Sequence, residues 1–195
     1  LMLGFHVPMV QGQPAAPEIN VWVVIQPDET VIVRIARSEM GQGTLTGLAQ
    51  LVAEELECDW ALVSTEQVSA QSNFAAKRAW GEMGTGGSRG IRTSHDYVRR
   101  GGAAARLLLL QAAANDWQVP MAELRVAAGV ITHKPSGRTT TYGKVAPAAS
   151  RLTPPTEVAL KDPKDWKLIG KPIRRLDTID KLTGKQVYGA DLKLP

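Results

Sequence analysis

Two glycine-rich segments carry the residues of this sequence that are best suited to chemistry. The first, residues 38–44 (Ser-Glu-Met-Gly-Gln-Gly-Thr), lies between an expected strand and an expected helix. Glycines on both sides of Gln42 let the backbone approach a ligand closely and leave the amide side chain projecting alone. Free N–H groups at the start of the following helix favour an anion or an oxo ligand. The alternative is a plain tight turn with Gln42 in solvent.

The second segment, residues 84–90 (Gly-Thr-Gly-Gly-Ser-Arg-Gly), opens another expected helix. Small residues, a hydroxyl group and an arginine at a helix start predict a nest that binds an anion. Residues 77–106 support this prediction, because they contain seven basic residues and two acidic ones, Glu82 and Asp96. The segment matches neither a Walker A loop nor a dinucleotide-binding fingerprint. It therefore predicts a phosphate or pyrophosphate site, and the alternative is a surface loop with solvated arginines.

Other reactive groups are scattered along the chain. Ser88, His95 and Asp96 form a conceivable Ser-His-Asp set, but no nucleophile elbow surrounds the serine. No set of His, Cys and carboxylate residues has metal-ligand spacing. The single cysteine, Cys58, excludes an internal disulfide and any zinc-finger or iron–sulfur pattern within this chain. We expect Cys58 to be a small buried hydrophobic residue.

The elements that position both segments follow from apolar periodicity. Runs of β-branched residues predict strands, and apolar residues at helical spacing predict helices. In the helix after the first segment, Gln50, Glu54 and Glu57 face away from the apolar side. The order of elements predicts an α+β fold, a mostly antiparallel sheet with helices on one face. The expected strands are 19–25, 30–36, 62–68, 125–133 and 138–142, and the expected helices are 44–57, 88–117 and 143–150, with an irregular stretch at 71–89.

Composition excludes several classes of protein. Of the 195 residues, 44% are hydrophobic and 22% are charged, which excludes a disordered chain, a collagen-like fibre and a coiled coil. The net charge of +4 arises entirely within residues 161–193, so residues 1–160 sum to zero. This neutral majority and an aromatic content of 5% argue against a nucleic-acid-binding protein. No stretch reaches the length of a membrane-spanning helix.

Composition also divides the chain into four parts. Residues 1–18 are apolar and then rich in Pro, Ala and Gln, as in the remnant of an export signal or anchor followed by a linker. An arm packed on a partner is the alternative for this part. Residues 19–150 form the α+β unit, and residues 151–169, rich in Lys, Pro and Asp, form a linker. Residues 170–195 begin a further domain.

By their order and spacing, three segments together resemble the molybdenum hydroxylases. They are residues 39–43 (Glu-Met-Gly-Gln-Gly), residues 52–56 (Val-Ala-Glu-Glu-Leu) and the second glycine-rich segment. Residues 170–177 (Gly-Lys-Pro-Ile-Arg-Arg-Leu-Asp) are similar to the opening of the family's α/β hammerhead domain. The order of these parts resembles the branch that holds the isoquinoline 1-oxidoreductase β subunit and the membrane-bound aldehyde dehydrogenase large subunit.

The resemblance implies a molybdenum–molybdopterin cofactor, with the cytosine dinucleotide form as one option. Gln42 is then expected to hydrogen-bond an oxo ligand of molybdenum or the pterin, and no residue of the chain is expected to ligate the metal directly. The family's catalytic glutamate, in a Gly-Glu motif, has no counterpart here, since Glu82 after Gly81 does not match its position. The implied cofactor-binding residues are Met40, Gly41, Gln42, Gly43, Thr85, Gly86, Gly87, Ser88 and Arg89.

The resemblance also implies a function. The chain is expected to be part of the molybdopterin-binding catalytic subunit of an oxidoreductase that hydroxylates an aldehyde or an N-heterocycle with water-derived oxygen. The implied partners are the remainder of the large subunit, a [2Fe–2S] small subunit that receives the electrons, a c-type cytochrome subunit and the small-molecule substrate, with no nucleic acid. The implied location is the periplasmic side of the bacterial inner membrane, with the cytoplasm as the alternative. The competing function is a non-catalytic α+β scaffold, which is indicated if the two glycine-rich segments lie at opposite ends of the domain.

Overall fold

The structure, a computed structural model, describes residues 17–193. The expected export remnant at residues 1–18 therefore lies almost wholly outside the described residues. Among the residues that are described, no helix is long and apolar enough to cross a membrane.

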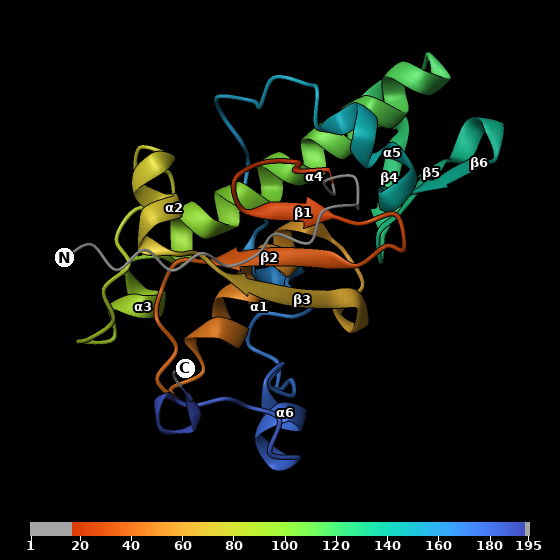
Figure 1. Ribbon diagram of the computed structural model, residues 1–195. Helices are drawn as coiled ribbons and strands as arrows, with labels where there is room; N and C mark the ends of the chain where they lie inside the picture. Colours follow the sequence, from red (N-terminus) through yellow and green to blue (C-terminus); the bar gives the residue numbers. More distant parts are fainter. Residues whose placement is uncertain (1–16, 194–195) are drawn as a thin grey trace.

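The centre of the fold is a three-stranded sheet (Figure 1). β1 (Val23–Ile25) pairs antiparallel with β2 (Val31–Ile35), and β2 pairs parallel with β3 (Val63–Gln67). A parallel pair needs a crossover connection, which α1 (Thr44–Leu56) supplies between β2 and β3. Alternate residues of β2 are buried, so the sheet presents one apolar face to the core.

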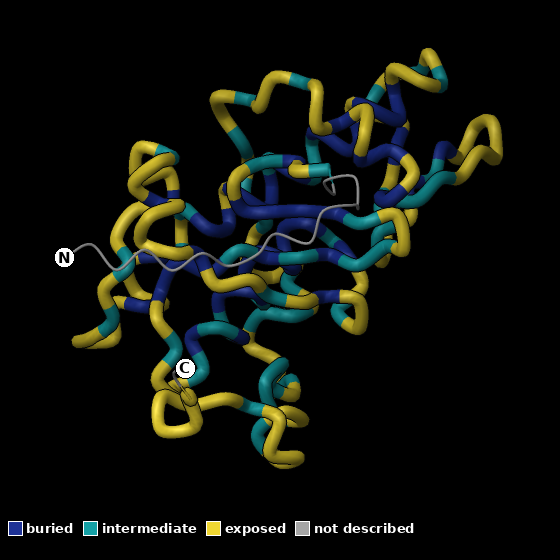
Figure 2. Tube along the Cα trace, in the orientation of Figure 1, coloured by how far each residue is buried: buried dark blue, intermediate teal, exposed yellow. Residues whose placement is uncertain are grey.

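Glycines bring α1 and α4 (His95–Trp117) into close contact. A Cβ on Gly102 would lie 2.5 Å from the carbonyl oxygen of Val52, and a Cβ on Gly101 would lie 2.5 Å from Trp22. A larger residue at Gly102 would force the two helices apart, and a larger residue at Gly101 would displace Trp22. The resulting core is apolar, and Figure 2 shows its buried residues concentrated in the central sheet and the helices packed on it.

A second three-stranded sheet, fully antiparallel, follows α4 along the chain. Its strands are β4 (Leu124–Ala127), β5 (Val130–His133) and β6 (Arg138–Thr141), and α5 (Tyr142–Ala149) closes the unit. The Tyr142 hydroxyl group donates to the last carbonyl group of α1 at 2.6 Å. This buried bond ties the second unit to the first.

The α+β class is confirmed, and the mostly antiparallel strands are divided between two sheets. The expected strand at 125–133 is wrong, because the chain turns at Ala128 and Gly129, whose φ angles are 48° and 77°. Its two halves are β4 and β5, which pair with each other.

The helix expected at 88–117 is interrupted near its start. α3 (Arg89–Arg92) ends before Thr93, and α4 begins at His95. The buried guanidinium group of Arg37 bonds the Thr93 and Ser94 hydroxyl groups at this break. The stretch expected to be irregular also contains a short helix, α2 (Ala70–Ala75).

After α5 the chain crosses back over α1 without forming a strand. We call residues 161–177 the tail strap, because they follow α1 from its C-terminal end to its N-terminal end. α6 (Thr178–Leu182) comes next and lies away from both sheets (Figure 1).

We expect Gly102→Ala to lower the free energy of unfolding by about 1–3 kcal/mol, the usual cost of overpacking a core. The sign is informative, because Gly→Ala inside an unconstrained helix stabilises by about 1 kcal/mol. Urea denaturation of the parent and of Gly102→Ala measures the difference in the free energy of unfolding. Gly189→Ala serves as the control, since a Cβ there meets no atom within 4 Å. Unchanged or raised stability of Gly102→Ala would contradict the close contact of α1 and α4.

Candidate functional site

The first glycine-rich segment forms the loop between the carboxyl end of β2 and the start of α1. Ligands of α/β units commonly bind outside the carboxyl ends of strands. Gly41 and Gly43 adopt φ angles of 100° and 87°, which residues with a side chain rarely adopt. The two glycines are therefore required by the backbone of the loop itself.

Glu39 organises this loop from within, a role not expected from the sequence. Its Oε1 accepts the N–H groups of Gly41 and Gly43 at 2.8 and 2.9 Å, and its Oε2 accepts that of Leu45 at 2.9 Å. Burial acts to raise the pKa of Glu39, but these backbone hydrogen bonds outweigh it and the pKa is lowered. The carboxylate occupies the positive end of α1. The anion site expected at this helix start is thus already filled by Glu39.

The Gln42 amide group is folded into its own loop. Its Nε2 donates to the Ser38 carbonyl oxygen at 2.9 Å and to Thr44 Oγ1 at 2.8 Å, while its Oε1 accepts the Met40 N–H at 2.6 Å. The expectation that this amide projects alone is wrong, because the loop offers it nearby partners. The residue is still exposed.

The second glycine-rich segment forms an exposed loop before α3. Gly86, Gly87 and Ser88 have positive φ angles in succession, 154°, 54° and 58°. Arg89 donates to the Gly86 carbonyl oxygen and Arg92 to that of Gly87, both at 3.4 Å. Two cationic side chains therefore lie against the backbone of this loop.

The two loops lie side by side. Thr85 Oγ1 donates to the Ser38 carbonyl oxygen at 2.9 Å, and a Cβ on Gly90 would lie 2.9 Å from Thr44 Oγ1. Together the loops line a cavity of about 420 Å³, which we call the loop pocket. Of the expected cofactor-binding residues, Gly41, Gly87 and Arg89 lie outside its wall. The lining residues are Met40, Gln42, Gly43, Thr44, Thr85, Gly86, Ser88, Gly90 and Ile91.

Buried Arg37 joins β2 to the second loop. Its side chain is 2% exposed, and its Nη1 donates to the Gly84 carbonyl oxygen at 2.6 Å. Its Nε donates to Ser94 Oγ at 3.0 Å, and its Nη2 donates to Thr93 Oγ1 at 2.9 Å. The Glu82 carboxylate lies 3.6 Å from Nη1. A buried cation is stable only when its donors are paired. Arg37 therefore fixes the second loop relative to the first.

The polar side of α1 binds the tail strap and not solvent. Glu54, 1% exposed, accepts the N–H groups of Lys167, Leu168 and Ile169 at 2.8, 2.6 and 3.1 Å. Burial acts to raise the pKa of Glu54, but these bonds and the Lys161 ammonium group lower it overall. The orientation expected for Glu54 is confirmed, and the tail strap covers this residue on the polar side of the helix.

Glu55 on the neighbouring side of α1 forms a buried ion pair. Its Oε1 accepts Arg99 Nε at 2.9 Å and Nη2 at 2.6 Å, and its Oε2 accepts the Lys161 N–H at 3.1 Å. The Arg99 guanidinium group also lies 5.1 Å from the centre of the Trp166 ring. Glu54 and Glu55 thus fasten the strap to α1 and α4.

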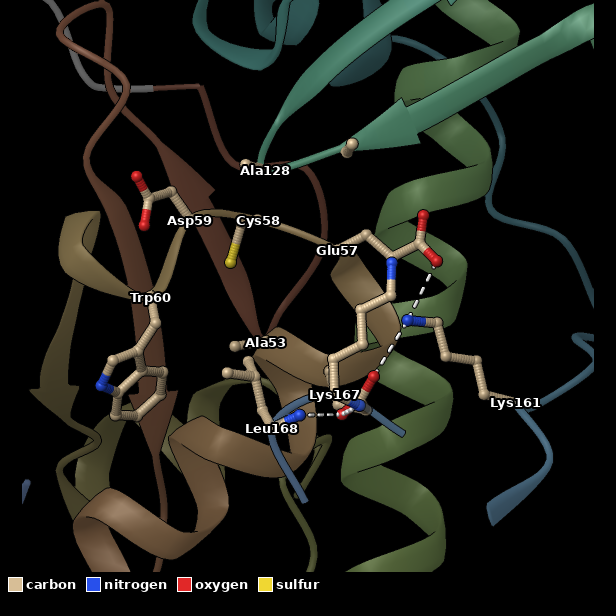
Figure 3. A pocket seen from close by; sticks show the side chains of 11 residues that line it. Ala53, Glu57, Cys58, Asp59, Trp60, Ala128, Lys161, Lys167 and Leu168 are labelled. Carbon is tan, nitrogen blue, oxygen red and sulfur yellow. Dashed lines mark hydrogen bonds and ion pairs between the residues drawn. The ribbon is translucent and has the colours of Figure 1, made fainter. Parts of the chain in front are cut away.

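A second cavity of about 390 Å³ lies at the other end of α1 (Figure 3). Its Lys161 ammonium group is engaged by two carboxylates, 2.9 Å from Glu57 and 3.0 Å from Glu54. Burial raises the pKa of Cys58 to about 12, so this thiol stays protonated at neutral pH and is a poor nucleophile. The expectation that Cys58 is buried is confirmed. None of the expected site residues lines this cavity.

The remaining reactive groups are not assembled for catalysis. Asp96 pairs with Arg100 at 2.9 Å, and His95 packs against Trp166 with ring centres 6.3 Å apart, so the conceivable set with Ser88 is not formed. Within residues 17–193, no group of three or more His, Cys, Asp and Glu side chains could hold a metal ion. The loop pocket is therefore the candidate site.

We expect Glu39→Gln to lower the free energy of unfolding by about 1–3 kcal/mol at pH 7, because a charged acceptor of three backbone N–H groups is lost. The folded-state pKa of Glu39 is lowered from 4.5, so its stabilisation is complete above that value and is lost as the pH falls through the lowered pKa. The difference in the free energy of unfolding between Glu39→Gln and the parent should therefore become smaller in acid. Urea denaturation at pH 7 and pH 3 measures it.

The control is Glu66→Gln, which removes an exposed partner of Arg34. An exposed ion pair contributes about 0–1 kcal/mol, so this variant should stay near the parent. A Glu39→Gln difference that is the same at both pH values would contradict the role of the charge.

The sequence matches the family model of the molybdopterin cofactor-binding domain over residues 3–187. It is 33% identical to isoquinoline 1-oxidoreductase subunit beta of Brevundimonas diminuta, an alignment that covers 93% of this chain and 28% of that protein. It is 31% identical to membrane-bound aldehyde dehydrogenase (pyrroloquinoline-quinone) of Gluconacetobacter polyoxogenes, over 91% of this chain and 23% of that protein.

A solved structure, quinoline 2-oxidoreductase from Pseudomonas putida 86, is 21% identical with a TM-score of 0.49, over 65% of this chain and 15% of that one. This chain spans between 23% and 28% of the length of the two curated relatives. The family model nevertheless covers most of the chain, and the expected resemblance is confirmed. The chain belongs to the molybdopterin cofactor-binding domain family of the molybdenum hydroxylases.

Proposed function

We propose that this chain is part of the molybdopterin-binding catalytic subunit of an oxidoreductase that hydroxylates an aldehyde or an N-heterocycle with water-derived oxygen. The observation that carries the proposal is the convergence of both glycine-rich loops on one cavity of about 420 Å³. The names of the two curated relatives, an isoquinoline oxidoreductase and an aldehyde dehydrogenase, supply the two substrate classes.

The loop pocket suits a flat heterocycle that carries a phosphate. A Cβ placed on Gly86, which lines the pocket, would meet no atom within 4 Å, so the backbone is open to a ligand there. Arg89 and Arg92 lie on the second loop outside the wall of the pocket, and these cations can pair with the phosphate oxygens of a ligand that extends beyond it. These features fit molybdopterin, and the cytosine dinucleotide form would add a second phosphate for the same arginines. When bound, the molybdenum cofactor supplies the two-electron redox chemistry of the reaction.

In this proposal the residues of the chain bind and orient the cofactor. Gly86, Gly87 and Ser88 hold the pterin through the backbone, and Arg89 pairs with its phosphate. Gln42 contacts an oxo ligand or the pterin by exchanging one of its two donor bonds within the loop for a bond to the ligand. The base that would take the proton from the attacking water-derived oxygen is not assigned to any residue of this chain.

The competing scaffold function is not favoured. It requires the two glycine-rich segments to lie at opposite ends of the domain, where no single ligand could contact both. They are instead joined by the bond between Thr85 and Ser38 and line one cavity.

We further propose that the complete enzyme includes the remainder of the large subunit, a [2Fe–2S] small subunit and a c-type cytochrome subunit, at the periplasmic side of the inner membrane. One relative is named a subunit and another is named membrane-bound, which supports an assembly near a membrane. Fractionation of the native host should place activity and molybdenum with periplasmic or membrane markers. Recovery of the whole complex in the cytosol would contradict this location.

In the complete enzyme, Gln42→Ala should lower kcat by about 100-fold or more. A donor aimed at charge that develops in the transition state contributes a few kcal/mol to catalysis. The same change should cost only about 1–2 kcal/mol of stability, through the lost hydrogen bonds of the loop. Steady-state kinetics and thermal denaturation separate the two effects. Full activity with normal molybdenum content would show that this loop is only a turn.

Gly86→Val should instead reduce the molybdenum content, because the added side chain would enter the loop pocket. Gly137→Val is the matched control, since Gly137 also has a positive φ angle, 70°, and a Cβ there also meets no atom within 4 Å, but it lies outside the wall of this pocket. Metal analysis of both purified enzymes gives the result. Equal molybdenum contents in the two variants would contradict the cofactor site.

A further inference from the structure

We propose that Arg175 is a positioning residue for the first glycine-rich loop, and that the tail strap acts through it to set the conformation of that loop. The functional consequence rests on the proposed function, because it requires this loop to contact the cofactor. The mechanical coupling between strap and loop can be tested by itself.

Arg175 contacts both the backbone of the loop and the residue that organises it. Its Nη1 donates to the Gly41 carbonyl oxygen at 2.7 Å, and its Nη2 lies 3.3 Å from Glu39 Oε1. The same Oε1 atom accepts the N–H groups of Gly41 and Gly43. The guanidinium group therefore restrains Gly41 at its carbonyl group, while Glu39 restrains it at its N–H group.

The guanidinium group is itself held in a fixed orientation. Its Nε and Nη2 donate to the two carboxylate oxygens of Asp177 at 2.9 and 2.7 Å, and Lys181 reaches the same carboxylate at 2.6 Å. The hydrogen bond from Arg175 is the main reason that the pKa of Asp177 lies well below its usual range. Two-point pairing of this kind fixes direction as well as distance. Nη1 is thereby aimed at the loop.

The strap that carries Arg175 is anchored along α1. Glu54 binds three consecutive N–H groups of the strap, the Gln50 amide group bonds the Leu168 carbonyl oxygen, and Thr46 Oγ1 accepts the Leu176 N–H at 3.1 Å. These anchors lie at successive i, i+4 positions on one face of the helix. Arg175 is thus the end of a fastened segment and not an isolated surface contact.

The expected effect of Arg175 is on conformation more than on global stability. Its side chain is 36% exposed, and exposed ion pairs contribute little to folding. Without it, the Gly41 carbonyl group loses its donor in a loop whose glycines have few steric restraints. The loop would then sample orientations of the peptide between Gly41 and Gln42 that displace Gln42 from the wall of the pocket.

The test compares Arg175→Gln with Arg174→Gln in the complete enzyme. Arg174 is the matched control, because it is adjacent, exposed and in no ion pair within the described part of the chain. Hydrogen exchange measured by mass spectrometry reports on the loop at residues 39–45. We expect about tenfold faster exchange there in Arg175→Gln only, with melting temperatures of both variants near the parent. We also expect kcat to fall by about fivefold or more in Arg175→Gln, with a smaller change in KM.

Equal exchange of the loop in both variants would overturn the coupling, whatever the loop binds. Faster exchange with parental kcat and molybdenum content would overturn the positioning role while leaving the contact in place. The Gly86→Val enzyme, prepared in parallel, distinguishes failure of the positioning role of Arg175 from failure of the proposed function. If Gly86→Val keeps its molybdenum, the cofactor site is wrong, and if it loses molybdenum, only the role of Arg175 is wrong.

Discussion

Two adjacent buried carboxylates on α1 hold the structure together. Glu54 binds backbone N–H groups of the strap, and Glu55 pairs with Arg99 of α4. Removing a charge from water is costly unless its oxygens find donors, and a buried pair that loses one partner is strongly destabilised. Displacing the strap would leave Glu54 without its donors. Residues 161–177, although they form no strand, are for this reason as much a part of the fold as the helices.

This constraint explains why α1 is ordered along its whole length with polar residues on two sides. Its apolar side packs on the sheet, Gly102 of α4 approaches it closely, and its polar side is covered by the strap. The start of the helix is held by Glu39 and the end by the Tyr142 hydroxyl group. The loop pocket therefore lies at the start of a helix whose own surroundings leave it little freedom to move.

The electrostatics of the loop pocket are divided between its two loops. Glu39 already neutralises the positive end of α1. The first loop therefore presents the Gln42 amide group and peptide groups to a ligand, with little positive charge. The cations lie at the second loop, where Arg89 and Arg92 contact the backbone. A ligand with a neutral polar edge and an anionic arm matches this division. Buried Arg37 fixes the two halves relative to each other, although they are more than 40 residues apart.

Much of this protein could be predicted from local patterns in the sequence. Alternating β-branched residues determined β2, and the apolar spacing of residues 44–57 determined α1, because burial of one face leaves a periodic trace in the chain. The glycine-rich segments indicated both loops, and their order with residues 52–56 indicated the family. Glu39, which holds the start of α1, also has a local signal, because it is an acidic residue shortly before the positive end of a helix.

Only the tertiary structure decided what the polar side chains of these elements contact. The local pattern correctly turned Glu54 away from the apolar core, but its partners lie more than 110 residues further along the chain. Arg175 contacts Gly41 across 134 residues, and Thr85 contacts Ser38 across 47. Helix and strand periods are set by neighbouring residues, whereas hydrogen bonds between distant segments depend on where the whole chain folds. Local patterns in the sequence therefore determined most of the elements and the family, and the packing of distant segments determined the loop pocket.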